Sequence, residues 1–273
     1  MKIYKFTTRG IQWSYHWFSF VLGSLRFLES NDEKVNILIP ELLNTKDMDY
    51  CYESLEYFKD KFNFYFDTQL FNPNENEIIE YFGEKLLADD KISEEAYTYI
   101  RDKILNKYIN NNLFMNECIF IKRNNQSNLA FNTHLPKRRN LVQEEELCTI
   151  LTNKYNFKCI NLEDYNLNDK IAIFQNAKIV VSTMGGALIF AIFANINTKI
   201  VELYCDPQIT NGRNHFKNLC EDLKLNYERY SETVSFVNDH PLYIVDSSIS
   251  LDVNSFLNYL EKMGIKNIDK DKV

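Results

Sequence analysis

Between residues 118 and 203, short apolar segments with strand character alternate with longer segments that have the period of a helix. The expected strands lie at 118–121, 157–162, 178–182 and 199–203, and the expected helices lie at 144–155, 167–176 and 186–194. A helix that connects two strands in this way makes the strands parallel, and helices then cover both faces of the sheet. Because such crossovers are right-handed, the loops that follow the strands meet at one edge, where ligands bind.

The first half of the chain predicts a second unit of the same kind. Residues 2–7 alternate like a strand, Ser14 can cap a helix with one apolar face, and residues 35–39 form a buried strand. The remaining expected elements of this half are a strand at 62–66 and helices at about 48–61 and 93–108.

An asparagine-rich run at 110–112 marks the expected boundary between two domains. A length of 273 residues suits two compact domains. We therefore predict a Rossmann-like N-terminal domain at residues 1–115 and a Rossmann-like C-terminal domain at residues 116–273. A terminal helix at about 253–263 is expected to pack across the junction.

The bulk composition excludes several classes of protein. Hydrophobic residues make up 45% of the chain and charged residues 25%, which is enough for a buried core. The formal net charge of −7 argues against a nucleic-acid partner, although it allows one local basic site for a single diphosphate. The six cysteines include no closely spaced pair, so we expect no structural zinc site.

The chain carries no pattern that predicts export or a membrane anchor. Residues 1–9 are charged and strand-like, unlike a signal peptide, and the apolar run at 13–28 is interrupted by four polar residues. Cysteines scattered through apolar stretches are typical of reduced thiols in a cytosolic protein. The sequence therefore predicts a cytoplasmic protein with no membrane span.

The strand at 178–182 leads through two glycines directly into the helix expected at 186–194. Gly185 and Gly186 let the main chain approach a ligand, and the N–H groups that begin the next helix carry partial positive charge. This arrangement suits a diphosphate, although a tight strand-to-helix corner gives the same pattern. The pattern is not GxGxxG, so a nicotinamide cofactor is not supported. The residues of this candidate site are Thr183, Met184, Gly185, Gly186 and Ala187.

Charged residues near the neighbouring strand ends can complete a nucleotide site. Glu202 stands near the end of the strand at 199–203, where a carboxylate can accept hydrogen bonds from both hydroxyls of a ribose, although a solvated acid is the simpler interpretation of this residue alone. Arg123 follows the strand at 118–121 and so lies at the ligand edge, where its guanidinium can pair with phosphate oxygens. The other members of this basic cluster are Lys122, Lys137, Arg138 and Arg139. Of these, Arg138 and Arg139 are further candidate phosphate ligands.

The order and spacing of these pieces resemble glycosyltransferase family 61. The resemblance covers residues 118–230 well and residues 13–29 moderately, where His16 and Trp17 look like part of the family's aromatic-His-Trp segment. The matching runs of the second half are 119–123, 138–147, 157–163, 167–177, 180–188 and 200–203.

This resemblance implies a GT-B-like α/β fold, in which two Rossmann-like domains face each other across a cleft. It implies inverting transfer from a UDP-sugar to a hydroxyl of a glycan or glycoprotein acceptor, with xylose favoured as the sugar and N-acetylglucosamine next. No metal or other cofactor is obligatory for such transfer. Two positions depart from the family pattern, because Gly185 replaces a histidine and Gln143 replaces an asparagine.

Inverting transfer needs a base that takes the proton of the acceptor hydroxyl while the diphosphate leaves. His16 is the candidate base, because it begins the first helix after the first strand and histidine side chains titrate near neutrality. A histidine that only caps the helix or packs in the core is the competing interpretation. The acids that rival it as base are Glu41, Asp67 and Asp206. His134 and His240 are expected in loops. His215, just before a helix, could touch the donor sugar, although a surface role is favoured.

Two other functions remain open on the sequence alone. A non-catalytic module that binds a nucleotide or glycan could keep this scaffold without the chemistry, and glycine in place of histidine at residue 185 motivates that alternative. A different α/β enzyme, such as a nucleotide-sugar epimerase or a hydrolase, is disfavoured. The chain has neither a GxGxxG turn after its first strand nor a Gly-x-Ser-x-Gly elbow.

Overall fold

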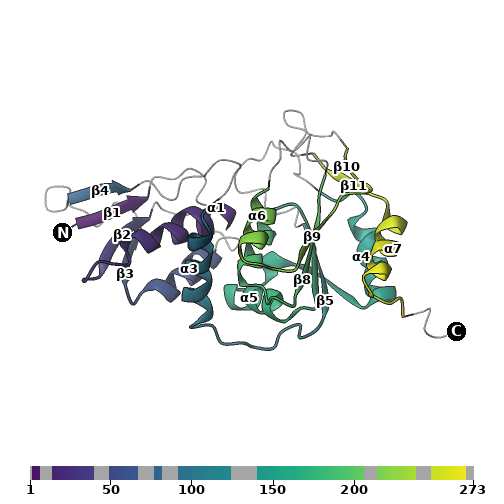
Figure 1. Ribbon diagram of the computed structural model, residues 1–273, viewed down its shortest axis with the longest axis horizontal. Coiled ribbons are helices and arrows are strands. Elements are labelled where there is room, and N and C mark those ends of the chain that lie inside the picture. Colours follow the sequence, from purple (N-terminus) through teal and green to yellow (C-terminus); the bar gives the residue numbers. More distant parts are fainter. Residues whose placement is uncertain are drawn as a thin grey trace. The chain divides into compact units, whose positions relative to one another are not determined.

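The computed structural model divides the chain into two compact units, of which Figure 1 shows the elements. One unit contains residues 1–109 and 166–168, and the other contains residues 110–165 and 169–273. Both are mixed α/β units with parallel sheets, which confirms the predicted fold class at that level. The structure describes residues 2–6, 14–39, 49–66, 77–81, 92–123, 140–205, 214–237 and 247–268, with the main chain alone at Phe6 and at 77–81.

The first unit is built on a four-stranded parallel sheet with the strand order β3-β2-β1-β4. Its strands are β1 (Lys2–Phe6), β2 (Val35–Ile39), β3 (Phe62–Phe66) and β4 (Glu77–Tyr81). The chain moves outward from β1 through β2 to β3 and then returns to the other side of β1 with β4. The direction of travel therefore reverses at β1, and the carboxyl ends of β1 and β4 form the switch point of this sheet.

The helical segment that follows β1 changes its winding along its length. It starts as α1 (Ser14–His16), continues as a π-helix, η1 (Trp17–Leu22), and ends as a 3-10 helix, η2 (Gly23–Leu28). Helix α3 (Glu94–Leu105) comes close at Gly23, where an added β-carbon would lie 3.0 Å from Cβ of Ala96. A side chain at residue 23 would therefore require the two helices to move slightly apart.

The indole of Trp17 anchors this helical segment against α2 (Asp49–Leu55), which the 3-10 turn η4 (Glu56–Phe58) continues. Trp17 is fully buried, and its Nε1 donates a 2.8 Å hydrogen bond to Oγ of Ser54. The Ser54 hydroxyl in turn donates to the carbonyl oxygen of Cys51 at 2.7 Å. Both polar groups are thus satisfied inside the core, as buried donors and acceptors must be.

The second unit carries a five-stranded parallel sheet with the strand order β6-β5-β7-β8-β9. Its strands are β5 (Cys118–Lys122), β6 (Phe157–Asn161), β7 (Ile179–Thr183), β8 (Lys199–Leu203) and β9 (Tyr227–Tyr230). From β5 the chain moves to β6 at one edge, crosses to β7 on the other side of β5, and continues outward. The switch point of this sheet therefore lies between β5 and β7.

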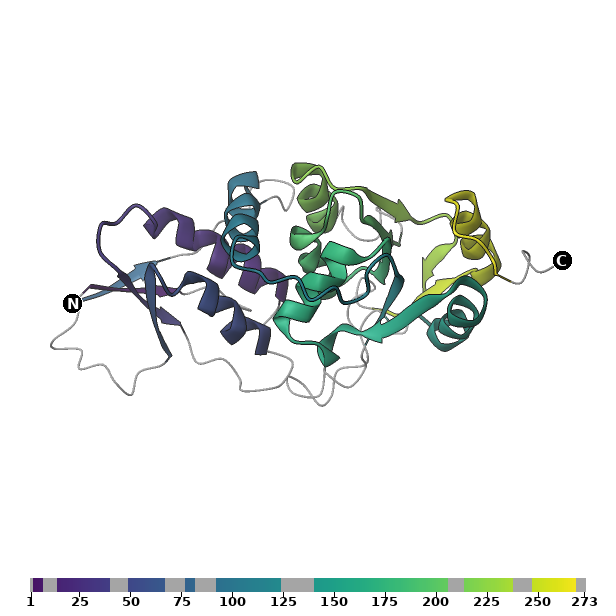
Figure 2. The same ribbon diagram turned by 90° about the horizontal axis from the view of Figure 1, so that it is seen from below.

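Helices cover both faces of the second sheet, and α4 and α7 lie side by side on one of them (Figure 1, Figure 2). That face carries α4 (Glu144–Tyr155) and α7 (Val253–Lys262), and the other carries α5 (Leu167–Asn176), the 3-10 helix η9 (Gly186–Phe193) and α6 (His215–Asp222). The core under α4 and α7 includes Phe120, Val181, Val201, Leu147, Leu151, Phe256 and Leu260. In the described part of the chain, no helix has the length and apolar character needed to cross a membrane.

The observed elements differ from the predicted ones in two informative ways. The helix expected at 186–194 has 3-10 winding over Gly186–Phe193 and is not an α-helix. The strands β4 and β9 and the antiparallel pair β10 (Val234–Phe236) and β11 (Ile249–Leu251) were not predicted. In β9 the reason is the charges of Glu228 and Arg229, which interrupt the apolar pattern but find partners on β8.

Replacing Ser54 by alanine is expected to lower the free energy of unfolding of the first unit by about 1–3 kcal/mol, because Nε1 of Trp17 then stays buried without its acceptor. Urea unfolding followed by tryptophan fluorescence measures the change. Ser30→Ala is the matched control at an exposed position, with an expected change within about 0.5 kcal/mol. Equal stability of the two variants would contradict the prediction.

Candidate functional site

The carboxyl ends of β5 and β7 lie next to each other at the switch point of the second sheet. Their pairing sets Ile121 opposite Ser182, so the chain leaves both strands at the same level of the sheet. Arg123 follows β5 there, while Met184 and Gly185 follow β7. A crevice between two such strand ends is where open α/β sheets bind ligands. This edge is therefore the candidate site.

The guanidinium of Arg123 lies against the main chain of the turn that follows β7. Its Nη1 donates a hydrogen bond to the carbonyl oxygen of Met184 at 3.3 Å. A β-carbon on Gly185 would lie only 2.6 Å from the same Nη1. Gly185 is buried and Gly186 is exposed, so the main chain reaches the surface directly after the residue that packs on the guanidinium.

Gly185 is favoured by the space beside Arg123 and not by its backbone conformation, because a β-carbon there would require the flexible end of the Arg123 side chain to shift. Its φ of 174° and ψ of 176° describe an extended main chain that any residue can adopt. After it, η9 begins at Gly186, and the N–H of Leu188 donates to the carbonyl oxygen of Gly185 at 3.1 Å. The side chains of Thr183 and Met184 are buried, whereas Gly186 is exposed and Ala187 is partly buried.

The carboxylate of Glu144, the first residue of α4, holds the chain directly after β5. Its Oε2 accepts a 2.8 Å hydrogen bond from the main-chain N–H of Arg123, directly after β5 ends. Burial raises the pKa of the Glu144 carboxyl, although the Arg123 N–H and the charge of Lys122 act in the opposite direction. Sequence reasoning assigned Glu144 no role. The signal that could have found it is an acid in the first turn of a helix that starts beside a strand end.

Gln143, one of the two positions that depart from the family pattern, joins the start of α4 to β11. Its Nε2 donates to Oγ of Ser250 at 2.9 Å, and its Oε1 accepts from the N–H of Leu251 at 3.0 Å. A main-chain hydrogen bond of 2.9 Å from Val142 to Ile249 supports the same connection. The first turn of α4 is thus fixed to the C-terminal strand pair.

Glu202 lies one residue before the end of β8, with its side chain on the face that α6 covers. The carboxylate is 1% exposed, and its Oε2 accepts hydrogen bonds from Nε of Arg229, at 3.0 Å, and from the hydroxyl of Tyr227. The guanidinium of Arg229 also stacks on the ring of Tyr204 at 3.7 Å and donates to Asn214 at 2.8 Å. Glu202 is therefore part of a buried ion pair, and its contact with a ribose stays a prediction.

The electrostatics of this cluster follow from the buried carboxylate. Burial, and then the charge of Glu202, raises the pKa of the Tyr227 hydroxyl. Burial has the largest single effect and lowers the pKa of Arg229, but the charge of Glu202, its hydrogen bond and the neighbouring tyrosines together outweigh burial and raise that pKa. Tyr227 and Arg229 therefore keep their protons at neutral pH, and both continue to donate hydrogen bonds to the carboxylate of Glu202.

His16 belongs to the first unit, where it ends the short helix α1 that follows β1. The ring is partly buried and packs edge-on against Phe20, with ring centroids 5.1 Å apart. The catalytic role of His16 stays a prediction. His215 is the first residue of α6. Several residues that the sequence analysis named as candidate ligands, bases or loop histidines lie outside the described part of the chain. They are Arg138, Arg139, Lys137, Glu41, Asp67, Asp206, His134 and His240.

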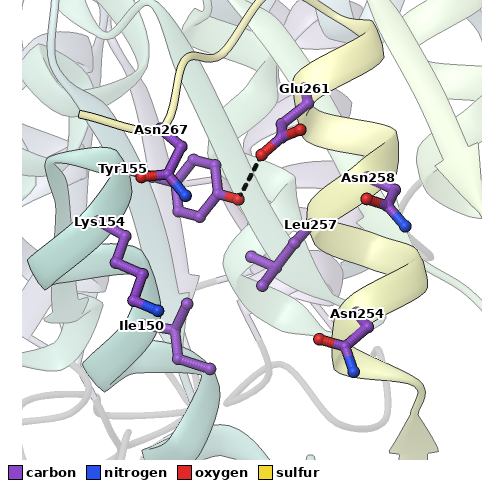
Figure 3. Close-up of a pocket in the computed structure, with 8 residues that line it drawn as sticks. All are labelled: Ile150, Lys154, Tyr155, Asn254, Leu257, Asn258, Glu261 and Asn267. Atoms are coloured by element: carbon purple, nitrogen blue, oxygen red, sulfur yellow. Dashed lines mark hydrogen bonds between the residues drawn. The ribbon is translucent and has the colours of Figure 1, made fainter. Parts of the chain in front are cut away.

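A separate concave surface lies between α4 and α7, as Figure 3 shows. The hydroxyl of Tyr155 donates to Oε1 of Glu261 at 2.8 Å between the two helices. The other residues that line it are Ile150, Lys154, Asn254, Leu257, Asn258 and Asn267. Among the residues that the structure describes, none that was predicted to bind or react lines this groove. We therefore place the candidate site at the strand ends.

The fold and the strand-end site define a Rossmann-like α/β protein with a cation and a glycine turn at its switch point, a setting suited to a phosphorylated ligand. The family model for Glycosyltransferase 61 matches residues 15–201, which is more than half of the chain. The chain therefore belongs to glycosyltransferase family 61 and is a transferase enzyme. A comparison with curated proteins finds no significant match.

Replacing Glu202 by alanine is expected to lower the free energy of unfolding by about 3–5 kcal/mol, because Arg229 then keeps a largely buried charge without its carboxylate. Urea unfolding followed by circular dichroism measures the loss.

The matched control is Glu228→Ala on the neighbouring strand. Glu228 pairs with Lys199 at 2.7 Å, but the two side chains are 42% and 25% exposed, so the expected loss is about 0–1 kcal/mol. A similar loss for both variants would show that the Glu202 pair is no more important than a surface pair. UDP affinity of the folded Glu202 variant then separates a ribose contact from this structural role.

Proposed function

We propose that this enzyme transfers a sugar from a UDP-sugar to an acceptor hydroxyl with inversion at the anomeric carbon. The observation that carries the proposal is the Arg123 guanidinium against the Gly185 turn, at the carboxyl ends of β5 and β7. A cation beside an exposed glycine main chain favours an anionic ligand such as a diphosphate over a neutral one.

The chemistry follows from the charge of the leaving group. As the bond between sugar and diphosphate breaks, negative charge grows on the diphosphate, and groups that stabilise this charge lower the barrier. Arg123 can pair its guanidinium with two oxygens, and the main chain at Gly186 and Ala187 can donate to a third. The contact with Met184 holds the guanidinium in place before the donor binds, which reduces the reorganisation needed during the reaction.

The finer features of the proposal rest on the family resemblance. Xylose is the favoured sugar and N-acetylglucosamine the next, and the acceptor is a glycan or glycoprotein. In the proposed GT-B-like arrangement the N-terminal domain binds the acceptor and the C-terminal domain binds the donor. Glu202 is proposed to contact the ribose, Arg138 and Arg139 are proposed as further phosphate ligands, and no metal is proposed to be obligatory.

The proposal predicts that UDP stabilises the protein. At a hundred times its Kd, UDP is expected to raise the free energy of unfolding by about 2.7 kcal/mol, measured by thermal unfolding with NAD as the control ligand. UDP-xylose and UDP-N-acetylglucosamine are then assayed for release of UDP, with water and with simple sugars as acceptors. Stabilisation by NAD but by no uridine nucleotide would overturn the proposal. Binding without release from any donor would indicate a module that only binds.

His16→Ala is expected to lower kcat by about 10²–10⁴-fold, the usual contribution of a general base, while UDP affinity changes less than twofold. Affinity is expected to be spared because a general base acts on the acceptor hydroxyl and not on the nucleotide. Turnover and isothermal titration calorimetry measure the two quantities, and His215→Ala, at the start of α6, is the control histidine variant. Turnover equal to wild type would dismiss His16 as the base.

A further inference from the structure

We propose that Glu144 is a positioning residue of the donor site, which holds Arg123 so that its guanidinium stays in the space left open by the missing side chain of Gly185. The inference rests on the proposed function and adds to it a residue that does not touch the donor. Three observations support it, which concern the space at the turn, the end of β5 and the start of α4.

The first observation is the fit between the guanidinium and the turn. Nη1 of Arg123 would be 2.6 Å from a β-carbon at Gly185, and Cζ would be 3.7 Å from it. Because the main chain of Gly185 is extended, its conformation does not call for glycine. Any side chain at this position would have to displace the guanidinium. Gly185 and Arg123 therefore act as a pair, in which the first provides the space and the second fills it with a positive charge.

The second observation is the hydrogen bond at the end of β5. The sheet ladder orders the main chain only as far as Lys122, where β5 is paired with β6. The next N–H, that of Arg123, donates to Oε2 of Glu144 at 2.8 Å. The carboxylate thus extends the ordered main chain by the one residue that carries the cation. A hydrogen bond to a carboxylate is roughly twice as strong as one between neutral groups, so Glu144 is well suited to this task.

The third observation is that Glu144 itself is fixed. It is the first residue of α4, and the preceding Gln143 bonds through both ends of its amide to Ser250 and Leu251. The carboxylate therefore sits on a helix start that the C-terminal strand pair holds in place. Its direction is set before any ligand binds, which is the condition for a residue that positions another.

The test measures the affinity for UDP of wild type and of three variants by isothermal titration calorimetry. Glu144→Ala is expected to weaken UDP binding by about tenfold, because Arg123 loses its main-chain anchor. Glu144→Gln is expected to stay within about threefold of wild type, because an amide oxygen still accepts the Arg123 N–H. Glu145→Ala is the matched control, since Glu145 is the exposed neighbour on the same turn. Circular dichroism and thermal unfolding confirm that each variant is folded.

A double-mutant cycle separates positioning from a general effect on the fold. In an Arg123→Ala background, Glu144→Ala and Gly185→Ala are each expected to cause less than a twofold further loss, because the cation that they place is gone. With Arg123 present, Gly185→Ala is expected to weaken UDP binding by at least fivefold. Full additivity of Glu144→Ala and Arg123→Ala would overturn the inference, and so would wild-type affinity of Glu144→Ala.

Inorganic pyrophosphate serves as a second probe that distinguishes this inference from the proposed function. If wild type binds pyrophosphate but neither UDP nor a UDP-sugar, the donor proposal is refuted. The role of Glu144 is then tested by the same double-mutant cycle, with pyrophosphate affinity as the measured quantity. Binding of neither probe would overturn both. Binding of UDP with an unaffected Glu144→Ala variant would overturn only the role of Glu144.

Discussion

The pairing of β5 with β7 is the constraint on which the candidate site depends. Both strands are buried in the middle of the second sheet, and their register sets Ile121 opposite Ser182. A slip of one residue would turn every side chain of a strand to the other face, so the core enforces the register strongly. The position of Arg123 beside the Gly185 turn is therefore a consequence of how apolar strands pack, and the site inherits its rigidity from the core.

The polar contacts around these strand ends form a continuous series that starts far along the chain. Strand β11 holds Gln143, the next residue Glu144 holds the main chain of Arg123, and the Arg123 side chain rests on the turn. The family match ends at residue 201, so β10 and β11 lie beyond it and still contribute. Main-chain atoms supply several of these contacts, and such contacts do not depend on which side chains the strand pair carries.

The pair Glu202–Arg229 shows how a tertiary contact changes the meaning of a charged residue. Considered alone, an acid near a strand end suggests either a ligand contact or a solvated side chain. In the folded protein its carboxylate is buried and already accepts from Arg229 and Tyr227. A buried charge is stable only with such partners. One task of Glu202 is therefore to neutralise and orient the guanidinium of Arg229 on β9. The same pairing explains why β9 is a strand despite its charged residues.

The sequence by itself determined that the chain contains parallel α/β structure, where most of the strands and helices lie, and that a glycine turn joins β7 to η9. These are local properties, because the hydrophobic period and the place of a glycine can be read within a few residues. Only the tertiary structure decided that β7 pairs directly with β5 on the side opposite β6. This pairing brings Arg123 to Met184, a residue 61 positions later in the chain. The tertiary structure alone revealed Glu144 as the anchor of Arg123 and Arg229 as the partner of Glu202. The physical reason is that strand order and register are chosen by burial over the whole sheet, which no short stretch of sequence records.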